Sequence, residues 1–60
     1  MHVLQTQTGL FYTGKAGEGW VSPERADAFG YNAYAEVCRV QEIFNKRSAL
    51  TGLLFQIEAA

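Results

Sequence analysis

Residues 32–47, NAYAEVCRVQEIFNKR, are the one stretch of this chain that is long and periodic enough to predict a helix directly. At about 100° per residue, the apolar residues of this stretch gather in one narrow sector, which contains Ala33, Val37, Val40 and Phe44. Ile43 and Tyr34 flank that sector. An isolated helix of this length is not stable in water, so the apolar stripe requires another surface that covers it. The rest of the chain must supply that surface.

The opposite side of the predicted helix is charged. It carries Arg39, Glu42 and Lys46, and Glu42 precedes Lys46 by four residues, a spacing that adds slightly to the stability of an exposed helix. Asn32 is expected to cap the start, because its side-chain oxygen can accept a hydrogen bond from a free N–H of the first turn. The helix is expected to end between Phe44 and Arg47, where basic side chains suit its negative pole.

Length and composition predict a single small domain over residues 1–60. With 48% hydrophobic residues, burial is the main source of stability, and self-association would add to it. The one cysteine, Cys38, excludes an internal disulfide, and no cluster of Cys and His indicates a structural metal. No cofactor is expected.

The charge and the distribution of apolar residues limit the partners. A net charge of −1, from five basic and six acidic residues, gives no general attraction to polyanions and disfavours strong non-specific nucleic-acid binding. The apolar runs are too short to span a membrane, and the N-terminus lacks the basic-then-apolar pattern of a signal peptide. A cytoplasmic protein without a membrane partner is expected.

The segments before the helix favour strands. Residues 3–13, VLQTQTGLFYT, predict one long strand with a bulge or bend at Gly9, and with Phe11 facing the helix. The glycine-rich residues 14–19 predict a hairpin loop that leads into Trp20 and Val21. A phosphate-binding loop is not favoured, because that motif leads directly into a helix and this loop does not.

The remaining segments complete the sheet. Residues 22–25 predict a turn or a single helical turn, and residues 27–31 a short third strand or an extended lead-in to the helix, with Phe29 pointing inward. Residues 49–57, ALTGLLFQI, predict the last strand. Its inward-facing residues are expected to be Thr51, Leu53, Phe55 and Ile57.

These elements predict an α+β fold, in which a single helix packs on one face of a three- or four-stranded, largely antiparallel sheet. One helix covers only one face, so the second face is expected to be open and to contact a partner. The candidates for that surface are Leu10, Tyr12, Leu54 and Trp20. For Trp20, burial in the core is favoured over the partner surface, because a small domain can seldom leave its one tryptophan uncovered.

The run FYTGKAGEGWVSPERADAF, followed by the amphipathic helix and a closing strand, resembles small uncharacterised bacterial and phage-encoded α+β proteins. The resemblance covers most of the chain. It implies a phage or prophage origin and an accessory role in binding a host or viral macromolecule. It assigns no functional residue.

Three groups of reactive side chains are candidates for a catalytic site. Cys38 has no evident base beside it, and His2 is expected to fray with the terminus. Glu18, Glu24 and Asp27 are expected to form a solvated turn, since paired catalytic carboxylates need a cleft that separates their pKa values. No enzymatic activity is expected.

Two functions follow as hypotheses. The first is a non-enzymatic protein-interaction module, a homodimer or an adaptor, that uses the open apolar surface. The second is a nucleic-acid accessory protein that stacks bases on Tyr12 and Trp20. Its phosphate contacts would come from Lys15, Arg39, Lys46 and Arg47.

Overall fold

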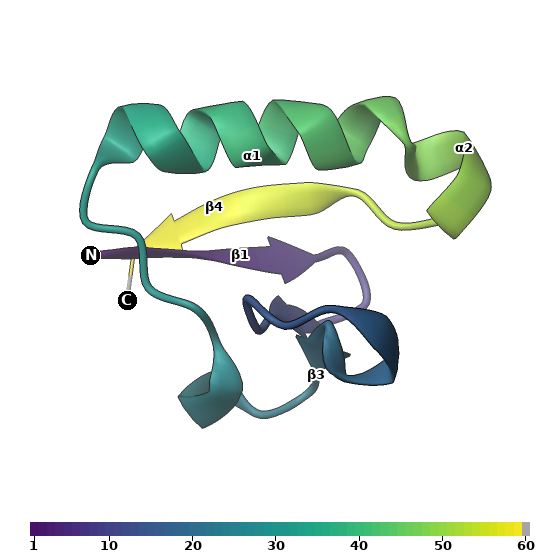
Figure 1. Ribbon diagram of the computed structural model, residues 1–60, viewed down its shortest axis with the longest axis horizontal. Helices are drawn as coiled ribbons and strands as arrows, with labels where there is room; N and C mark the ends of the chain where they lie inside the picture. The colour runs from purple at the N-terminus through teal and green to yellow at the C-terminus, as the bar shows by residue number, and fades with distance from the viewer. Residues whose placement is uncertain (60) are drawn as a thin grey trace.

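The computed structural model describes residues 1–59 as a four-stranded antiparallel sheet with one main helix, which confirms the predicted α+β fold. The strand order is β3-β2-β1-β4, and α1 lies across one face over β4 and β1 (Figure 1). In chain order the elements are β1 (His2–Thr6), β2 (Phe11–Tyr12), the 3-10 turn η1 (Gly17–Gly19), β3 (Val21–Ser22), the 3-10 turn η2 (Arg25–Asp27), α1 (Tyr34–Lys46), α2 (Ser48–Thr51) and β4 (Phe55–Ala59). No helix within residues 1–59 has the length and apolar character needed to cross a lipid bilayer.

The first predicted strand, residues 3–13, is a hairpin in the structure and not one strand. The chain reverses after Thr6, whose N–H donates to the Leu10 carbonyl at 2.7 Å, and Gly9 adopts φ +87° in the turn. The buried Thr6 hydroxyl accepts hydrogen bonds from the backbone N–H groups of Thr8 (3.3 Å) and Leu10 (3.0 Å). Gly9 therefore makes a full reversal where a bulge was predicted.

This reversal decides which side chains face α1. Residues opposite each other in an antiparallel pair share a face, and the register pairs Leu4 with Ile57, Thr6 with Phe55 and Tyr12 with Val21. Leu4 and Phe55 lie in the core cluster against Val37 of α1. Tyr12 thus faces the helix together with Leu4 and Thr6. Phe11 pairs with Gln5 on the opposite face, so the prediction that Phe11 faces the helix is wrong: the turn at Gly9 keeps the alternation of faces and does not shift it.

The second face of the sheet is not open at its centre. Val3 and Phe11 lie on that face and are only 4% and 5% exposed. Part of the cover comes from Arg25 of η2, whose guanidinium carbon lies 5.6 Å from the centre of the Phe11 ring and whose Nη2 donates to the Ala59 carbonyl at 2.8 Å. A single side chain thus reaches from above β2 to the end of β4. The expected open surface on this face is therefore not found there.

The helix α1 starts later than predicted. Ala33 stands at the N-cap position without a side-chain hydrogen bond, so Asn32 does not cap the helix. The predicted apolar stripe is confirmed from Val37 onward: Val37 is fully buried, and Val40 and Phe44 pack against the core cluster. Ala33 lies before the first turn and is exposed.

The segment after α1 is helical where a strand was predicted. Residues 48–51 form the short helix α2, and Gly52 ends it in the left-handed conformation with φ +73°. Glycine is the residue that tolerates this terminating conformation. Phe55 and Ile57 face the helix as predicted, but Thr51 does not belong to the strand, which begins at Phe55.

The outer edge of β4 is joined to α1 through amide side chains. The Phe55 N–H donates to Asn45 Oδ1 at 2.9 Å, and the Phe55 carbonyl accepts from Asn45 Nδ2 (3.3 Å) and Gln41 Nε2 (3.0 Å). These bonds take the place of a neighbouring strand at an edge that would otherwise leave backbone groups free. They also fix the position of α1 relative to the start of β4.

The predicted strand at Trp20 and Val21 corresponds to β3 (Val21–Ser22), which pairs with β2 across the glycine loop. Residues 27–31, expected as a short third strand or an extended lead-in to the helix, do not form a strand. The predicted single helical turn is η2, at Arg25–Asp27. Further on, Tyr31 alone bridges to His2 through two backbone hydrogen bonds, of 2.9 and 2.7 Å. Tyr31 is also the buried anchor of this segment, at 6% exposure, whereas the predicted anchor Phe29 is 43% exposed and packs its ring on Tyr31.

Candidate functional site

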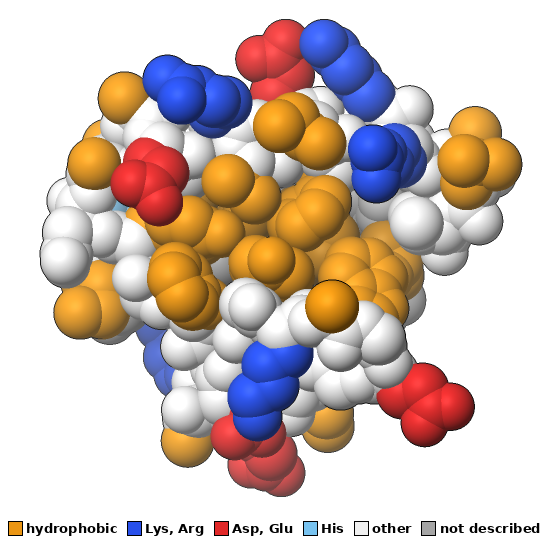
Figure 2. Space-filling model, in the orientation of Figure 1, with side chains coloured by type: hydrophobic (Ala, Val, Ile, Leu, Met, Phe, Trp, Pro, Cys, Tyr) orange, Lys and Arg blue, Asp and Glu red, His pale blue; other side chains and the backbone are white. Residues whose placement is uncertain are grey.

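An apolar groove lies on the helix side of the sheet, between α1 and the loop that joins β2 to β3. Because α1 sits over β4 and β1, it leaves the β2–β3 side of the same face uncovered. Figure 2 shows a hollowed hydrophobic area there, between the charged outer side of the helix and the polar loop. We call this area the groove and define it by four partly buried residues: Tyr12, Trp20, Val40 and Phe44.

One end of the groove deepens into a pocket of about 210 Å³. Its lining comes from four parts of the fold, namely the β2–β3 loop, α1, α2 with the residue before it, and β4. The lining residues are Trp20, Phe44, Arg47, Thr51 and Phe55. An apolar cavity of about 150 Å³ is large enough to bind benzene, so this pocket has room for one large apolar side chain.

The aromatic rings of the pocket support one another. The Phe44 ring lies 4.9 Å from Tyr12, 6.0 Å from Trp20 and 5.0 Å from Phe55, measured between centroids. Trp20 and Phe55 are 5.9 Å apart. The pairs with Tyr12 and Trp20 are edge-to-face, an arrangement that aromatic rings prefer. The rings are therefore fixed by packing. Tyr12, Trp20 and Phe44 are still partly exposed and form a preformed apolar surface, and Phe55 is buried beneath it.

The loop that carries Trp20 is fastened at its base. The Thr13 N–H donates to the Trp20 carbonyl at 2.9 Å, and the Thr13 hydroxyl donates to the Gly19 carbonyl. Gly14 and Gly17 adopt φ of +78° and +77°, which confirms the predicted hairpin loop with positive φ angles. These glycines let a short loop turn tightly enough to place Trp20 against α1.

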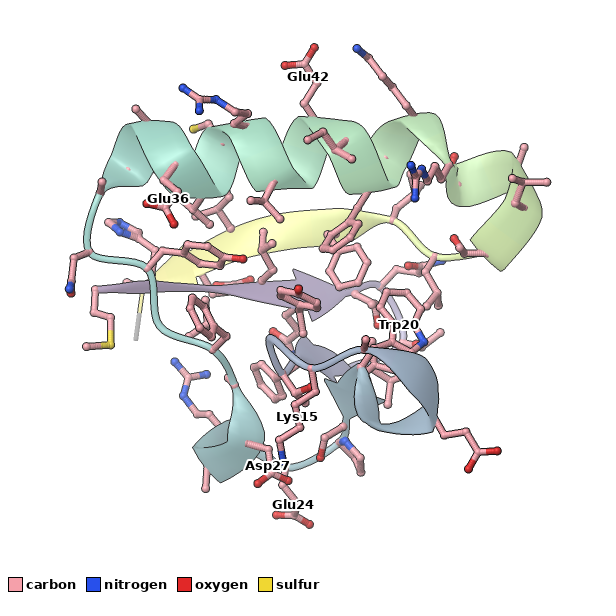
Figure 3. All side chains as sticks on the ribbon, viewed as in Figure 1. Lys15, Trp20, Glu24, Asp27, Glu36 and Glu42 are labelled. Atoms are coloured by element: carbon pink, nitrogen blue, oxygen red, sulfur yellow. The ribbon has the colours of Figure 1, made fainter. Side chains whose placement is uncertain are left out.

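The charges around the groove are unevenly placed. Arg47 lines the pocket, and no carboxylate within residues 1–59 lies within ion-pair distance of it. Arg39 and Lys46 point to the opposite side of α1, where Lys46 pairs with Glu42 at 3.4 Å. Figure 3 shows Glu42 on that outer side, and the Lys15 side chain extends away from α1.

The far end of the groove is acidic. Glu36 projects from the first turn of α1 toward the sheet (Figure 3). Burial, together with the nearby Tyr12 and Glu36, raises the pKa of Tyr31 to about 12. Glu36 is therefore close enough to disfavour a negative charge on Tyr31. The groove has a carboxylate near one end and a guanidinium at the other.

The structure brings together two of the four residues predicted for a partner surface. Tyr12 and Trp20 both contact Phe44. Leu10 lies in the β1–β2 turn. Leu54 is half exposed, and its carbonyl accepts a hydrogen bond from the Gln7 N–H of the same turn. Neither lines the pocket.

Sequence reasoning placed Phe44 and Phe55 in the core and did not assign Thr51 to the site. Only the helical fold of residues 48–51 brings Thr51 to the pocket. The one signal for it was Gly52, which could have been interpreted as the end of a helix.

The reactive side chains lie outside the groove. His2, which was expected to fray with the terminus, is paired in β1 and bridges to Tyr31; its ring lies 5.1 Å from Tyr34, edge to face. Hydrogen bonding and charge interaction with the half-buried thiol of Cys38 raise the pKa of Tyr34. Residues 1–59 contain no group of three or more His, Cys, Asp or Glu placed to bind a metal ion.

The acidic residues of the η2 region form a solvent-exposed turn. The Ser22 hydroxyl donates to Asp27 Oδ2 at 2.9 Å, and the Glu24 N–H donates to the same hydroxyl at 3.1 Å. Glu24 and Asp27 lie at the end of the molecule opposite α1 (Figure 3). They have the local hydrogen bonding of a turn.

Comparisons with protein-family models, with curated proteins and with solved structures give no match for this chain.

Proposed function

We propose that this protein is a non-enzymatic interaction module that binds another polypeptide in the groove between α1 and the β2–β3 loop. The observation that carries the proposal is the pocket of about 210 Å³ lined by Trp20, Phe44 and Phe55. Aromatic side chains are enriched at protein interfaces and dominate their binding energy. A small domain that leaves its one tryptophan partly exposed in a preformed hollow has the features of such a site.

The partner is either a second copy of the chain or another macromolecule of the same compartment. The resemblance to phage-encoded and bacterial proteins supports an accessory factor, and the free thiol of Cys38 suits a reducing cytoplasm. These wider roles are part of the same proposal.

Photo-crosslinking from the pocket tests the proposal. A benzophenone amino acid replaces Thr51, which lines the pocket and is exposed, and in a control protein it replaces Gln56, which is exposed on the other face of the sheet. We expect a crosslinked species from position 51 that excess unlabelled protein suppresses, and none from position 56. Equal crosslinking from both positions would contradict the proposal.

Sedimentation equilibrium then separates the two kinds of partner. If the partner is a second copy, the average mass rises with protein concentration, and the crosslinked species has twice the mass of the chain. The proposal would be contradicted if the chain remained monomeric at high concentration and no partner from the source cell were crosslinked.

Nucleic-acid binding is the second candidate, and the observation that favours it is the presence of Trp20 and Arg47 in one pocket. A base could stack on the ring while the guanidinium contacts a phosphate. Arg39 and Lys46 lie on the other side of α1, away from this pocket, and this weakens the case for nucleic-acid binding there. Titration with labelled single and double strands at low salt decides: absence of binding, or binding that salt does not weaken, eliminates this candidate.

A further inference from the structure

We infer that the pocket binds the C-terminal residue of a partner polypeptide, one with a large apolar side chain and a free α-carboxylate. The inference rests on the proposed function and specifies the chemistry of its partner. It starts from the composition of the lining, which is three aromatic residues, one arginine and one threonine around a single pocket of about 210 Å³.

The apolar part of the ligand follows from the rings. Trp20, Phe44 and Phe55 surround a space large enough for one leucine-sized or phenylalanine-sized group. The packing between their rings is already complete within this chain, so an incoming side chain meets a rigid surface. Such preorganisation reduces the entropic cost of binding.

The carboxylate follows from Arg47. This residue is exposed in the pocket lining and is not paired with a carboxylate of residues 1–59. The Thr51 hydroxyl, the other polar group there, is already used, because it donates to the Arg47 carbonyl at 3.4 Å and accepts from the Leu53 N–H at 3.1 Å. The guanidinium is therefore the group that remains to bind an anion, and its planar fork matches a carboxylate.

A C-terminal residue satisfies both requirements in the smallest space. Its side chain and its α-carboxylate are attached to the same carbon, so both can occupy one pocket. An internal acidic residue next to an apolar one would point to the opposite side of an extended peptide. Glu36 at the far end of the groove would repel acidic residues further upstream in the ligand. The ligand peptide that fits the groove therefore carries its negative charge at its C-terminus.

The experiment uses N-acetyl-leucine and N-acetyl-leucinamide, which differ only in the carboxylate. Trp20 is the one tryptophan of the chain, so its fluorescence and its indole N–H signal in NMR spectra report directly on the pocket. We expect N-acetyl-leucine to bind in the millimolar range, as its size allows, and to shift the Trp20 signal. We expect the amide to bind about three- to tenfold more weakly.

Two matched variants test the role of the guanidinium. In Arg47→Gln, N-acetyl-leucine and its amide should bind about equally, so that the ratio of their affinities is about one. Arg39→Gln changes the net charge equally but lies on the opposite side of α1, and should leave the preference unchanged. Circular dichroism of both variants establishes that they are folded.

Four results would overturn the inference. They are absence of binding at tens of millimolar, equal binding of acid and amide, a preference that persists in Arg47→Gln, and equally tight binding of acetyl-aspartyl-leucinamide, whose carboxylate is internal. Tighter competition by thymidine 5′-monophosphate would assign the pocket to nucleotides instead. If the inference fails while position 51 still crosslinks specifically to a protein, the proposed function stands without it.

Discussion

The two halves of the sheet are built differently. β1 and β4 pair along their full length, from His2–Ala59 to Thr6–Phe55, and α1 covers them. By contrast, β2 pairs with β1 at Gln5–Phe11 and with β3 over two residues. The fully buried side chains Leu4 and Val37 belong to the first half, whereas Tyr12 and Trp20 of the second half remain partly exposed. The first half therefore supplies most of the stability, and the second half supplies the surface.

Truncating the core of the first half should have the largest effect. Leu4 is fully buried, so Leu4→Ala is expected to lower the free energy of unfolding by about 2 to 5 kcal/mol, which approaches the total stability of a domain this small. Val21→Ala in β3 removes a partly buried side chain and should cost about 1 kcal/mol. Urea unfolding followed by circular dichroism measures both. Equal losses would break the comparison, and Leu4→Val supplies a milder variant if Leu4→Ala does not fold.

Three glycines of the β2–β3 loop form a graded series in the second half. Gly14 has a positive φ, and a Cβ placed there would collide with the Phe29 ring, so Gly14→Ala should cost about 2 to 4 kcal/mol. Gly17 has a similar φ but open space, so Gly17→Ala should cost about 1 to 2 kcal/mol. Gly19→Ala meets neither obstacle. Thermal unfolding should rank the three in this order, and an equal shift for Gly14 and Gly17 would show that the Phe29 contact contributes nothing.

The same contrast explains what could be predicted from the sequence. The α1 stripe and the 14–19 loop are encoded locally, by apolar spacing and by glycine, and both were predicted. The β1–β2 reversal depends on the Thr6 hydroxyl accepting two backbone N–H groups, and the β-favouring residues on both sides of it masked this turn in the sequence. The cover that Arg25 gives to Phe11 depends on a side chain from a distant turn.

The candidate site was predicted only in part. Tyr12 and Trp20 stood out as aromatics beside a glycine loop, and the structure does place both against Phe44. The pocket itself requires Arg47 and Thr51 to meet Trp20, which follows from α2, a helix for which Gly52 was the one signal in the sequence. Its position on the helix side, beside α1, also reverses the expected location on the second face of the sheet.

High pH should weaken the junction between the two halves, where Tyr31 bridges to His2. The pKa of Tyr31 is raised from 10.0 to about 12, mainly by burial, so the folded protein keeps this proton at pH values where the unfolded chain has lost it. Stability is fully retained below pH 10 and falls as the pH rises through 12, by at most about 2.7 kcal/mol at 1.36 kcal/mol per pKa unit. Urea unfolding between pH 9 and about pH 12 should show this decline, and Tyr31→Phe should reduce it. An identical decline in the variant would assign the effect to other groups.

Removing the amide that joins α1 to β4 should have an effect confined to the first half. Asn45→Ala leaves the part-buried Phe55 N–H without its acceptor, at an expected cost of about 1 to 3 kcal/mol. Asn45→Asp keeps that acceptor and loses the donor to the Phe55 carbonyl, which still accepts from Gln41, so its cost should be smaller. Hydrogen exchange at Phe55 reports the change directly. Unchanged protection in Asn45→Ala would show that the bond does not hold the strand edge.

The smallest effect is expected on the outer side of α1, which belongs to the stable half and yet contributes little to it. Glu42 and Lys46 are 3.4 Å apart with side chains 69% and 74% exposed, so solvent screens the pair strongly. Glu42→Gln should lower the free energy of unfolding by no more than about 0.5 kcal/mol, and 1 M salt should abolish the difference. A larger loss would mean that charge on the exposed side of the helix, and not only burial of Val37 beneath it, supports the first half. The difference between the halves would then have to be attributed partly to electrostatics.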